Sequence, residues 1–238
     1  MFTKHDESDI KVLLKKKARR KAVPGGPSKP LTLIINILHQ GFFYLDTTER
    51  LMRVCWEIIP FIILYAIVPP SNIGSFSFIV HVVLLIGFVH VLNWIFNHNF
   101  WNCINSTFPN MKNRGVKETS DYIRAVAARL KKQSSISAIM LLGSISRARW
   151  NDRSDIDMRI LRKQGIWNGI KASLLVSRER LIAVFVRQPL DVYLADTPAF
   201  LKKRRADEPP IFILKRDVRL DNASFPLPEL KYFNIGDS

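Results

Sequence analysis

This sequence has few cysteines, fewer acidic than basic residues and no apolar core in its first 30 residues. Each of these features excludes some classes of structure or function. Its two cysteines, Cys55 and Cys103, have neither a metal-ligand spacing nor a disulfide framework, so we expect reduced thiols. Lys and Arg outnumber Asp and Glu by 36 to 20, which gives a formal net charge of +16. Such a basic chain is expected to bind nucleic acid or an anionic membrane surface. The first 30 residues lack an apolar core and predict no cleavable signal peptide.

Exposed aromatic side chains are also expected to be few in the second half of the chain. Aromatic residues there, such as Trp150 and Tyr193, fall mostly at positions where the pattern predicts a core. A protein that binds single-stranded nucleic acid needs aromatic faces on which bases stack. The sequence therefore favours membrane lipids over nucleic acid as the anionic partner.

The pattern of the first 50 residues predicts two separate segments, neither of which forms a hydrophobic core of its own. Residues 1–30 form a basic cytoplasmic tail that ends in a Pro- and Gly-rich loop, either solvated or in contact with anionic headgroups. Residues 31–50 begin with an apolar run that Asn36, His39 and Gly41 interrupt. About 14 such residues do not easily cross a hydrocarbon core of about 30 Å. We expect a helix lying in the membrane interface, with packing against the soluble domain as the alternative.

Two longer apolar runs predict a transmembrane helical hairpin over residues 51–101. The first run, Val54–Val68, contains Glu57, and the second, Phe76–Phe96, has no formal charge and is long enough to cross a membrane. Basic residues flank the hairpin and the turn between the runs carries no charge, so both termini are expected in the cytoplasm, at the inner face of the cell membrane. We expect Glu57 to pair with Arg53, four residues earlier on the same helix.

From residue 117 to about residue 220 the pattern predicts a small α/β (α+β) domain. The expected elements, in chain order, are a helix at 118–132, strands at 136–142 and 155–161, a helix at 170–186, a strand around Asp191, a short helix at 197–205 and a strand at 211–214. In the 170–186 helix, Arg178, Glu179 and Arg180 are expected to be exposed. Residues 221–238 predict an irregular C-terminal tail.

An apolar strand, a Gly-Ser turn and a pair of aspartates lie at the centre of this domain. The strand at 136–142 leads into Gly143-Ser144, and alternation in the next strand places Asp155 and Asp157 on one face. Two neighbouring carboxylates repel each other unless a cation lies between them. Carboxylates suit Mg²⁺ or Mn²⁺, which also bind nucleotide phosphates. The glycine lets a backbone N–H approach a phosphate closely, and Ser144 adds a hydroxyl donor.

This constellation resembles the nucleotidyltransferases of the DNA polymerase beta-like superfamily. Their pattern is a hydrophobic strand, Gly-Ser, a spacer, and then Asp-hydrophobic-Asp-hydrophobic, which Gly143-Ser144 and Asp155-Ile156-Asp157-Met158 match. Arg147 falls where small members of the family carry an arginine. The sequence departs from them just afterwards, where Ala148-Arg149-Trp150 replaces the usual glycine.

The resemblance implies a nucleotidyltransferase core with a third carboxylate on a neighbouring strand. Asp191 is the candidate, because Leu190 and Val192 alternate onto the buried face and leave Asp191 beside the first pair if the strands are adjacent. Asp155 and Asp157 would then hold two Mg²⁺ (or Mn²⁺) ions, and Asp191 would ligate one ion or accept the proton of the acceptor.

The same resemblance implies roles for the turn. Ser144 and the backbone after Gly143 would hold the β- and γ-phosphates of a nucleoside triphosphate. Arg147 and Arg149 would counter the charge that builds on those phosphates.

These expectations combine into a membrane-anchored nucleotidyltransferase. It would transfer a nucleoside monophosphate to a hydroxyl or phosphate of a lipid-linked, glycan-precursor or protein acceptor. Two alternatives are an enzyme that adds nucleotides to RNA 3′ ends, and a non-catalytic, membrane-tethered protein that binds or senses nucleotides.

Overall fold

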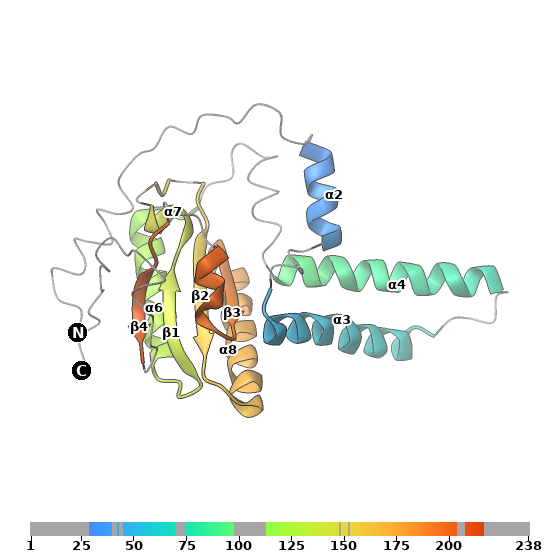
Figure 1. Ribbon diagram of the computed structural model, residues 1–238. Coiled ribbons are helices and arrows are strands. Elements are labelled where there is room, and N and C mark those ends of the chain that lie inside the picture. The colour runs from blue at the N-terminus through green and yellow to red at the C-terminus, as the bar shows by residue number, and fades with distance from the viewer. Residues whose placement is uncertain are drawn as a thin grey trace.

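A four-stranded sheet with helices on both faces is joined to two long antiparallel helices (Figure 1). The computed structural model describes residues 29–39, 42, 45–69, 75–97, 113–147, 149–151, 153–203 and 208–216. The tail expected at 1–30 lies outside them except for its last two residues, and the tail expected at 221–238 lies wholly outside them.

The sheet is mixed, in the order β3-β2-β1-β4. Its strands are β1 (Ile136–Leu141), β2 (Ile156–Arg162), β3 (Leu190–Ala195) and β4 (Ile211–Lys215). β1 runs antiparallel to both β2 and β4, whereas β2 and β3 are parallel. The expected α+β class with a mixed sheet is therefore confirmed.

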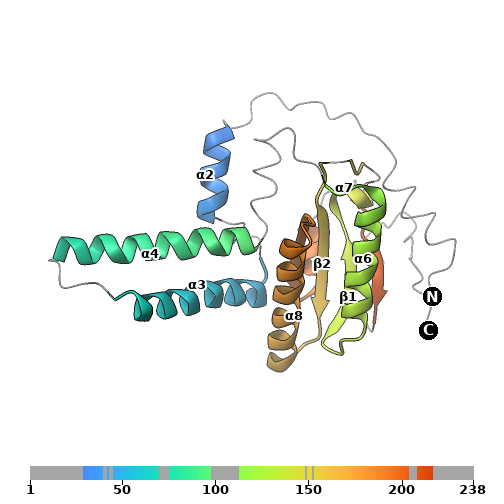
Figure 2. The same ribbon diagram turned by 180° about the vertical axis from the view of Figure 1, so that it is seen from behind.

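The two faces of the sheet differ in what covers them. Helices α6 (Val116–Lys131) and α8 (Ile166–Phe185) cover one face (Figure 2), where alternate residues of β2, including Ile156 and Met158, are fully buried. A 3₁₀ helix, η2 (Pro198–Lys203), lies on the other face, where Leu201 packs with Phe212. Because side chains alternate along a strand, Asp157 points to this less covered face.

Two charged residues of α8 are buried, so the expectation that they are exposed was wrong. Glu179 and Arg180 have no solvent exposure, whereas Arg178 is exposed. The Glu179 carboxylate accepts hydrogen bonds from Arg129 on α6, with Nη2–Oε2 at 2.6 Å and Nε–Oε1 at 3.0 Å. Buried charges are tolerated when they are paired and hydrogen-bonded. This pair joins α6 to α8 on the face of the sheet that the two helices cover.

Three helices precede the domain: α2 (Lys29–His39), α3 (Thr47–Ile67) and α4 (Ser75–Phe96). α3 and α4 lie side by side and run away from the sheet, and α2 lies crosswise at the end of α4 nearer the sheet (Figure 1). Among the described residues, one segment, Ser77–Phe96, is long and apolar enough to cross a membrane. α3 has sufficient length but carries several charged residues near its start, so a two-pass arrangement stays a prediction.

The polar residues between α3 and α4 pair differently from the expected Glu57–Arg53 contact. His90 Nδ1 lies 2.8 Å from Glu57 Oε1, and Asn93 Nδ2 donates to the same oxygen at 3.0 Å. Arg53 instead donates from Nε to Glu49 Oε1, 3.0 Å away and one helical turn earlier. The expected pairing was therefore wrong, because Glu49 is buried at the base of α3 and Glu57 faces α4.

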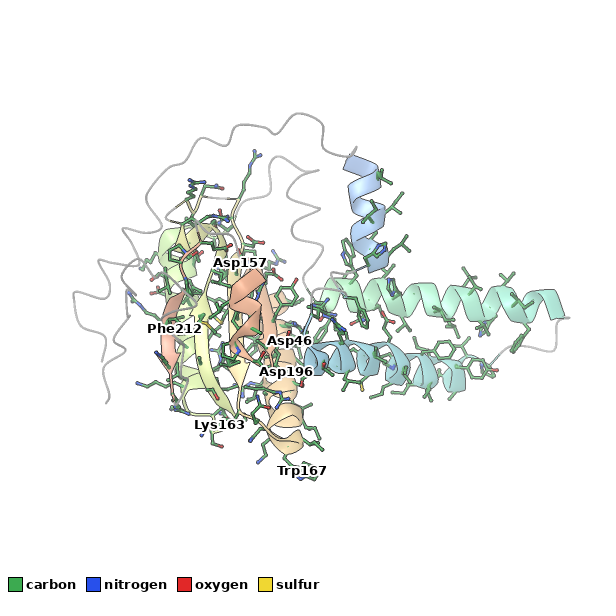
Figure 3. All side chains as sticks on the ribbon, viewed as in Figure 1. Asp46, Asp157, Lys163, Trp167, Asp196 and Phe212 are labelled. Carbon is green, nitrogen blue, oxygen red and sulfur yellow. The ribbon has the colours of Figure 1, made fainter. Side chains whose placement is uncertain are left out.

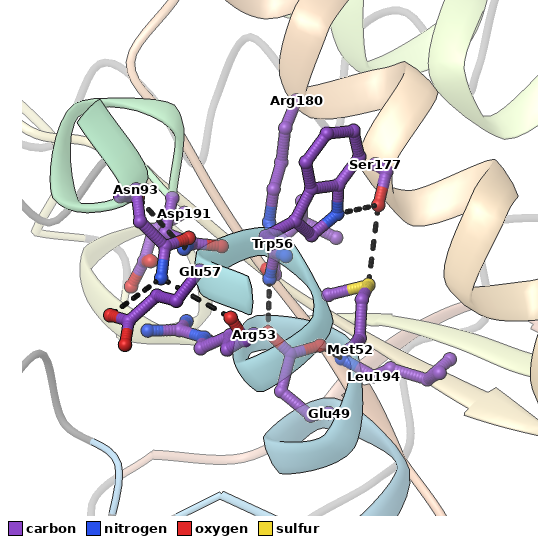
Figure 4. Close-up of polar contacts among 12 residues, drawn as sticks. Glu49, Met52, Arg53, Trp56, Glu57, Asn93, Ser177, Arg180, Asp191 and Leu194 are labelled. Carbon is purple, nitrogen blue, oxygen red and sulfur yellow. Dashed lines mark hydrogen bonds and ion pairs between the residues drawn. The ribbon is translucent and has the colours of Figure 1, made fainter. Parts of the chain in front are cut away.

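A buried cluster of charges joins α3 to the sheet (Figure 4). Glu49 Oε1 also accepts a hydrogen bond from Arg180 Nη2, and Glu49 Oε2 accepts the backbone N–H of Leu194 at 3.2 Å. Arg180 Nη2 donates in turn to the backbone oxygen of Val192 at 2.6 Å. Burial alone would raise the pKa of Glu49, but the charges of Arg180 and Arg53 outweigh it and lower this pKa. The cluster thus fixes α3 and α8 to strand β3.

Replacement of Glu49 by Gln is expected to destabilise the fold by about 3–5 kcal/mol, because it leaves two buried guanidinium groups without their carboxylate. Thermal unfolding of the full chain in detergent measures the change. Glu118→Gln is the control, since this exposed residue in the first turn of α6 contributes less than about 1 kcal/mol. Equal stability of the two variants would contradict the role assigned to the cluster.

Candidate metal centre

Three aspartates converge at one end of the parallel strand pair. Asp155 directly precedes β2, Asp157 lies within it, and the register of β2 and β3 places Asp191 opposite Asp157. One carboxylate oxygen from each residue lies within 4.8 Å of those of the other two. The structure thus brings together the three carboxylates that the sequence singled out.

The electrostatics of this cluster disfavour three bare negative charges. Burial raises the pKa of Asp157 well above its usual value, and the charges of Asp155 and Asp191 raise it further. Arg159 acts in the opposite direction. Among the described residues, Asp191 Oδ1 is buried and finds no hydrogen-bond donor. A buried oxygen without a donor beside two further carboxylates fits a hard divalent cation such as Mg²⁺ or Mn²⁺.

The turn after β1 lies directly against this cluster. Gly143 has φ of +66° and begins a short helix, α7 (Gly143–Ser146). A Cβ atom at Gly143 would lie only 1.6 Å from Asp157 Oδ2, so the close approach requires glycine in this position. Ser144 Oγ is buried and, among the described residues, has no hydrogen-bond partner. The turn that approaches Asp157 therefore also carries a buried hydroxyl, on the residue after Gly143, that has no partner among the described residues.

The basic residues after the turn occupy different positions. Arg147 is partly buried, and its Nη1 lies 3.7 Å from Glu208 Oε2. Arg149 is exposed, and its backbone N–H donates to the Ser144 carbonyl at 2.8 Å. The Glu208 carboxylate also accepts the backbone N–H of Gly143. A carboxylate thus occupies the N–H of Gly143, next to the backbone that the resemblance assigns to the phosphates.

Sequence reasoning missed Glu208 as a neighbour of the turn. The residue lies just before β4, and the antiparallel pairing of β4 with β1 places Ile211 opposite Leu141. The start of β4 therefore meets the end of β1, where Gly143 follows. The order of the strands, which one sequence does not reveal, was the information needed to find it.

Arg159 and Tyr193 extend the site along the same face. They are opposite each other in the β2–β3 register, two residues beyond Asp157 and Asp191, and the Arg159 guanidinium lies 4.1 Å from the centre of the Tyr193 ring. Both residues and Asp191 line a hollow of about 210 Å³ that also reaches Phe200. The two-residue spacing was a usable signal for both residues, because it places them on the face of the aspartates.

Comparison of the chain with family models, with curated proteins and with solved structures gives no match. The functional argument therefore rests on the motif and on the geometry of the site.

Asp157→Asn is expected to stabilise the metal-free protein and to abolish the stabilisation that Mn²⁺ gives. A carboxyl group whose pKa is raised by folding contributes stability at low pH that is lost as the pH rises through the folded-state pKa. The rise in unfolding temperature on adding Mn²⁺ should therefore grow in the native protein as the pH rises toward and through the raised pKa of Asp157. Thermal unfolding over a series of pH values tests both effects.

Asp121→Asn removes an exposed aspartate of α6 and should leave the Mn²⁺ effect and its pH dependence unchanged. An Mn²⁺ effect that survives in Asp157→Asn would contradict the assignment of the metal centre.

Gly143→Ala is expected to lose Mn²⁺ binding, because its methyl group would displace the Asp157 carboxylate. Gly165→Ala is a matched control: it also introduces a side chain at positive φ, +102°, but the nearest atom to its Cβ is Asn168 Nδ2 at 3.7 Å. Both variants bear backbone strain of about 1–3 kcal/mol. Mn²⁺ affinity, followed by electron paramagnetic resonance, should fall only in Gly143→Ala, and equal affinities would contradict the expectation.

Proposed function

We propose that this protein is a membrane-anchored nucleotidyltransferase. It transfers a nucleoside monophosphate from a nucleoside triphosphate to a hydroxyl or phosphate of an acceptor at the membrane, by a two-metal mechanism. The observation that carries the proposal is the convergence of Asp155, Asp157 and Asp191 beside the positive-φ turn at Gly143.

The residues have separate tasks in this reaction. Asp155 and Asp157 would hold the divalent cations, with Asp191 as the further ligand. Mg²⁺ or Mn²⁺, when bound, supplies positive charge that neutralises the triphosphate and makes the acceptor hydroxyl more acidic. Asp191 alternatively accepts the proton of the acceptor, whose oxygen forms a bond to the α-phosphorus while the bond to the leaving pyrophosphate breaks.

The turn binds the remainder of the triphosphate. The Ser144 hydroxyl, which has no partner among the described residues, would donate to a phosphate oxygen. Arg147 and Arg149 would offset the charge on the phosphates and on the leaving pyrophosphate. Glu208 must release the Gly143 N–H before a phosphate can accept it.

The position of the anchor favours an acceptor at the membrane surface. The guanidinium group of Arg53, in the base of α3, lies 5.2 Å from the centre of the Tyr193 ring. Tyr193 is on β3, the strand that also carries Asp191. If α3 and α4 cross the membrane as a hairpin, the site lies directly at its cytoplasmic end. A lipid-linked, glycan-precursor or membrane-protein acceptor fits this position better than a free polynucleotide.

The side chains near the site offer less to RNA. Trp150 and Phe212 are buried in the domain, and the Tyr193 ring contacts Arg159. The exposed Trp167 lies at the start of α8, far from Asp157 (Figure 3). Base stacking on aromatic side chains, which RNA end addition requires, therefore finds little support in these residues.

The second candidate is a nucleotide sensor that binds without turnover. The Glu208 contact does not separate the two candidates, because a carboxylate on the Gly143 N–H opposes a phosphate there in either case. In a sensor, a triphosphate would bind tightly without release of pyrophosphate. The three carboxylates favour the enzyme, because binding a nucleotide alone does not require a proton acceptor beside two metal ligands.

Purified full-length protein in lipid is expected to transfer label from one of the four α-labelled triphosphates, with Mg²⁺, to a component of a membrane extract. Asp191→Asn should lower the rate by at least about 100-fold, since loss of a residue that only orients a metal ligand already costs roughly 10–100-fold.

Asp121→Asn, which removes an exposed aspartate of α6 on the opposite side of the sheet from the three aspartates, should transfer label at the native rate. Full activity in Asp191→Asn would refute the proposed chemistry. Tight triphosphate binding without pyrophosphate release would identify the sensor instead.

A further inference from the structure

Helix α8 has an outward apolar face that the rest of the domain does not cover. The helix has 20 residues, and its inner side packs on the sheet through Ala172 and Val176. On its outer side Ile166 is 81% exposed, Trp167 75%, Leu174 64% and Phe185 78%. With 3.6 residues per turn these side chains share an arc of about 100°. A helix that is apolar on both sides is expected where both sides have apolar surroundings.

The outer face of α8 continues into the surface of α3. Trp56 Nε1 on α3 donates to Ser177 Oγ on α8 at 3.1 Å, so the two helices meet there. A hollow of about 700 Å³ lies in the corner between them, and its walls include Leu51 and Ile59 of α3 and Leu174 of α8. Because the corner opens along α3, whatever surrounds α3 also reaches this side of α8.

The direction of the helices fits a bilayer in this corner. α3 and α4 run away from the domain crosswise to α8, in both views (Figures 1 and 2). If α3 and α4 cross a membrane, α8 lies along its surface, with a length of about 30 Å. Lys171 and Arg178 are exposed next to the apolar arc, where they can meet anionic headgroups.

We propose that the outward face of α8 binds the cytoplasmic leaflet of the bilayer, with lipid acyl chains in the corner between α8 and α3. The proposal rests on the membrane insertion of α3 and α4 proposed above, but not on nucleotidyl transfer. It assigns to α8 a second function: the helix supports the sheet on one side and, on the other, prevents the domain from pivoting about the hairpin.

Environment-sensitive fluorophores at three positions of the full chain in nanodiscs test this contact. The labels are attached through Leu174→Cys, Leu84→Cys and Lys132→Cys, each in a background that lacks Cys55 and Cys103. Leu84 is exposed on α4 and reports membrane insertion, whereas Lys132 is exposed at the end of α6 and reports solvent. Each label is measured with and without lipids that carry a quencher on the acyl chain.

The label at residue 174 should be blue-shifted and quenched by these lipids, like the label at 84 and unlike that at 132. If the label at residue 84 is quenched while the label at 174 behaves like the label at 132, the hairpin is inserted but α8 does not touch lipid, and the proposal fails. If 84 is not quenched, insertion itself fails and the proposal with it. Contact between labels of two copies at residue 174, without lipid quenching, would identify a second chain as the occupant.

The double substitution Lys171→Glu and Arg178→Glu tests how much the contact of these side chains with lipid headgroups contributes to the binding of α8 to the membrane. Quenching of the label at 174 should fall in nanodiscs with anionic lipids and change less in zwitterionic ones, because opposite charge attracts the native side chains to anionic headgroups. Equal quenching in the native and substituted chains in anionic nanodiscs would overturn the role of this basic border. Transfer of nucleotide is measured separately, so loss of that activity leaves this contact intact.

Discussion

The parallel pairing of β2 with β3 is the constraint on which the site depends. Its register places Asp157 opposite Asp191 and Arg159 opposite Tyr193. A slip by one residue would turn Asp191 toward the core and destroy the cluster. Like charges opposite each other weaken the pairing, so other contacts must hold it. On the opposite face Ile156, Met158 and Val192 are buried against the helices, and this apolar packing fixes the register that brings the carboxylates together.

The same strand pair connects the site to the two long helices. Glu49 at the base of α3 accepts the backbone N–H of Leu194, and Arg180 of α8 donates to the backbone carbonyl of Val192. These two residues of β3 lie on either side of Tyr193, whose side chain lines the hollow. Loss of one partner of such buried pairs leaves an uncompensated charge, so the pairs hold α3, α8 and β3 in this arrangement. Movement of α3 would therefore disturb the strand that carries Asp191. The site and the proposed anchor form one unit rather than a domain on a loose tether.

Much of this arrangement could be predicted because it depends on local patterns. Alternation along β2 and β3 identified the face of Asp157 and Asp191, and the long apolar runs located α3 and α4. The failures arose where a residue takes its partner from distant sequence. Glu179 and Arg180 resemble surface residues until Arg129 and Glu49 are brought beside them by the fold. Glu208 reaches Gly143 only through the order of strands β1 and β4. Periodicity reports which face a residue occupies, but it does not report which element packs on that face.

The central claim is that three aspartates hold divalent cations beneath a turn that binds phosphate. Anomalous diffraction from crystals of the full chain grown with Mn²⁺ and a non-hydrolysable triphosphate tests it most directly. The account predicts manganese peaks within about 2.0–2.3 Å of carboxylate oxygens of Asp155, Asp157 and Asp191, with phosphate oxygens completing the coordination. A triphosphate bound in the crystal with manganese away from these aspartates would contradict the account.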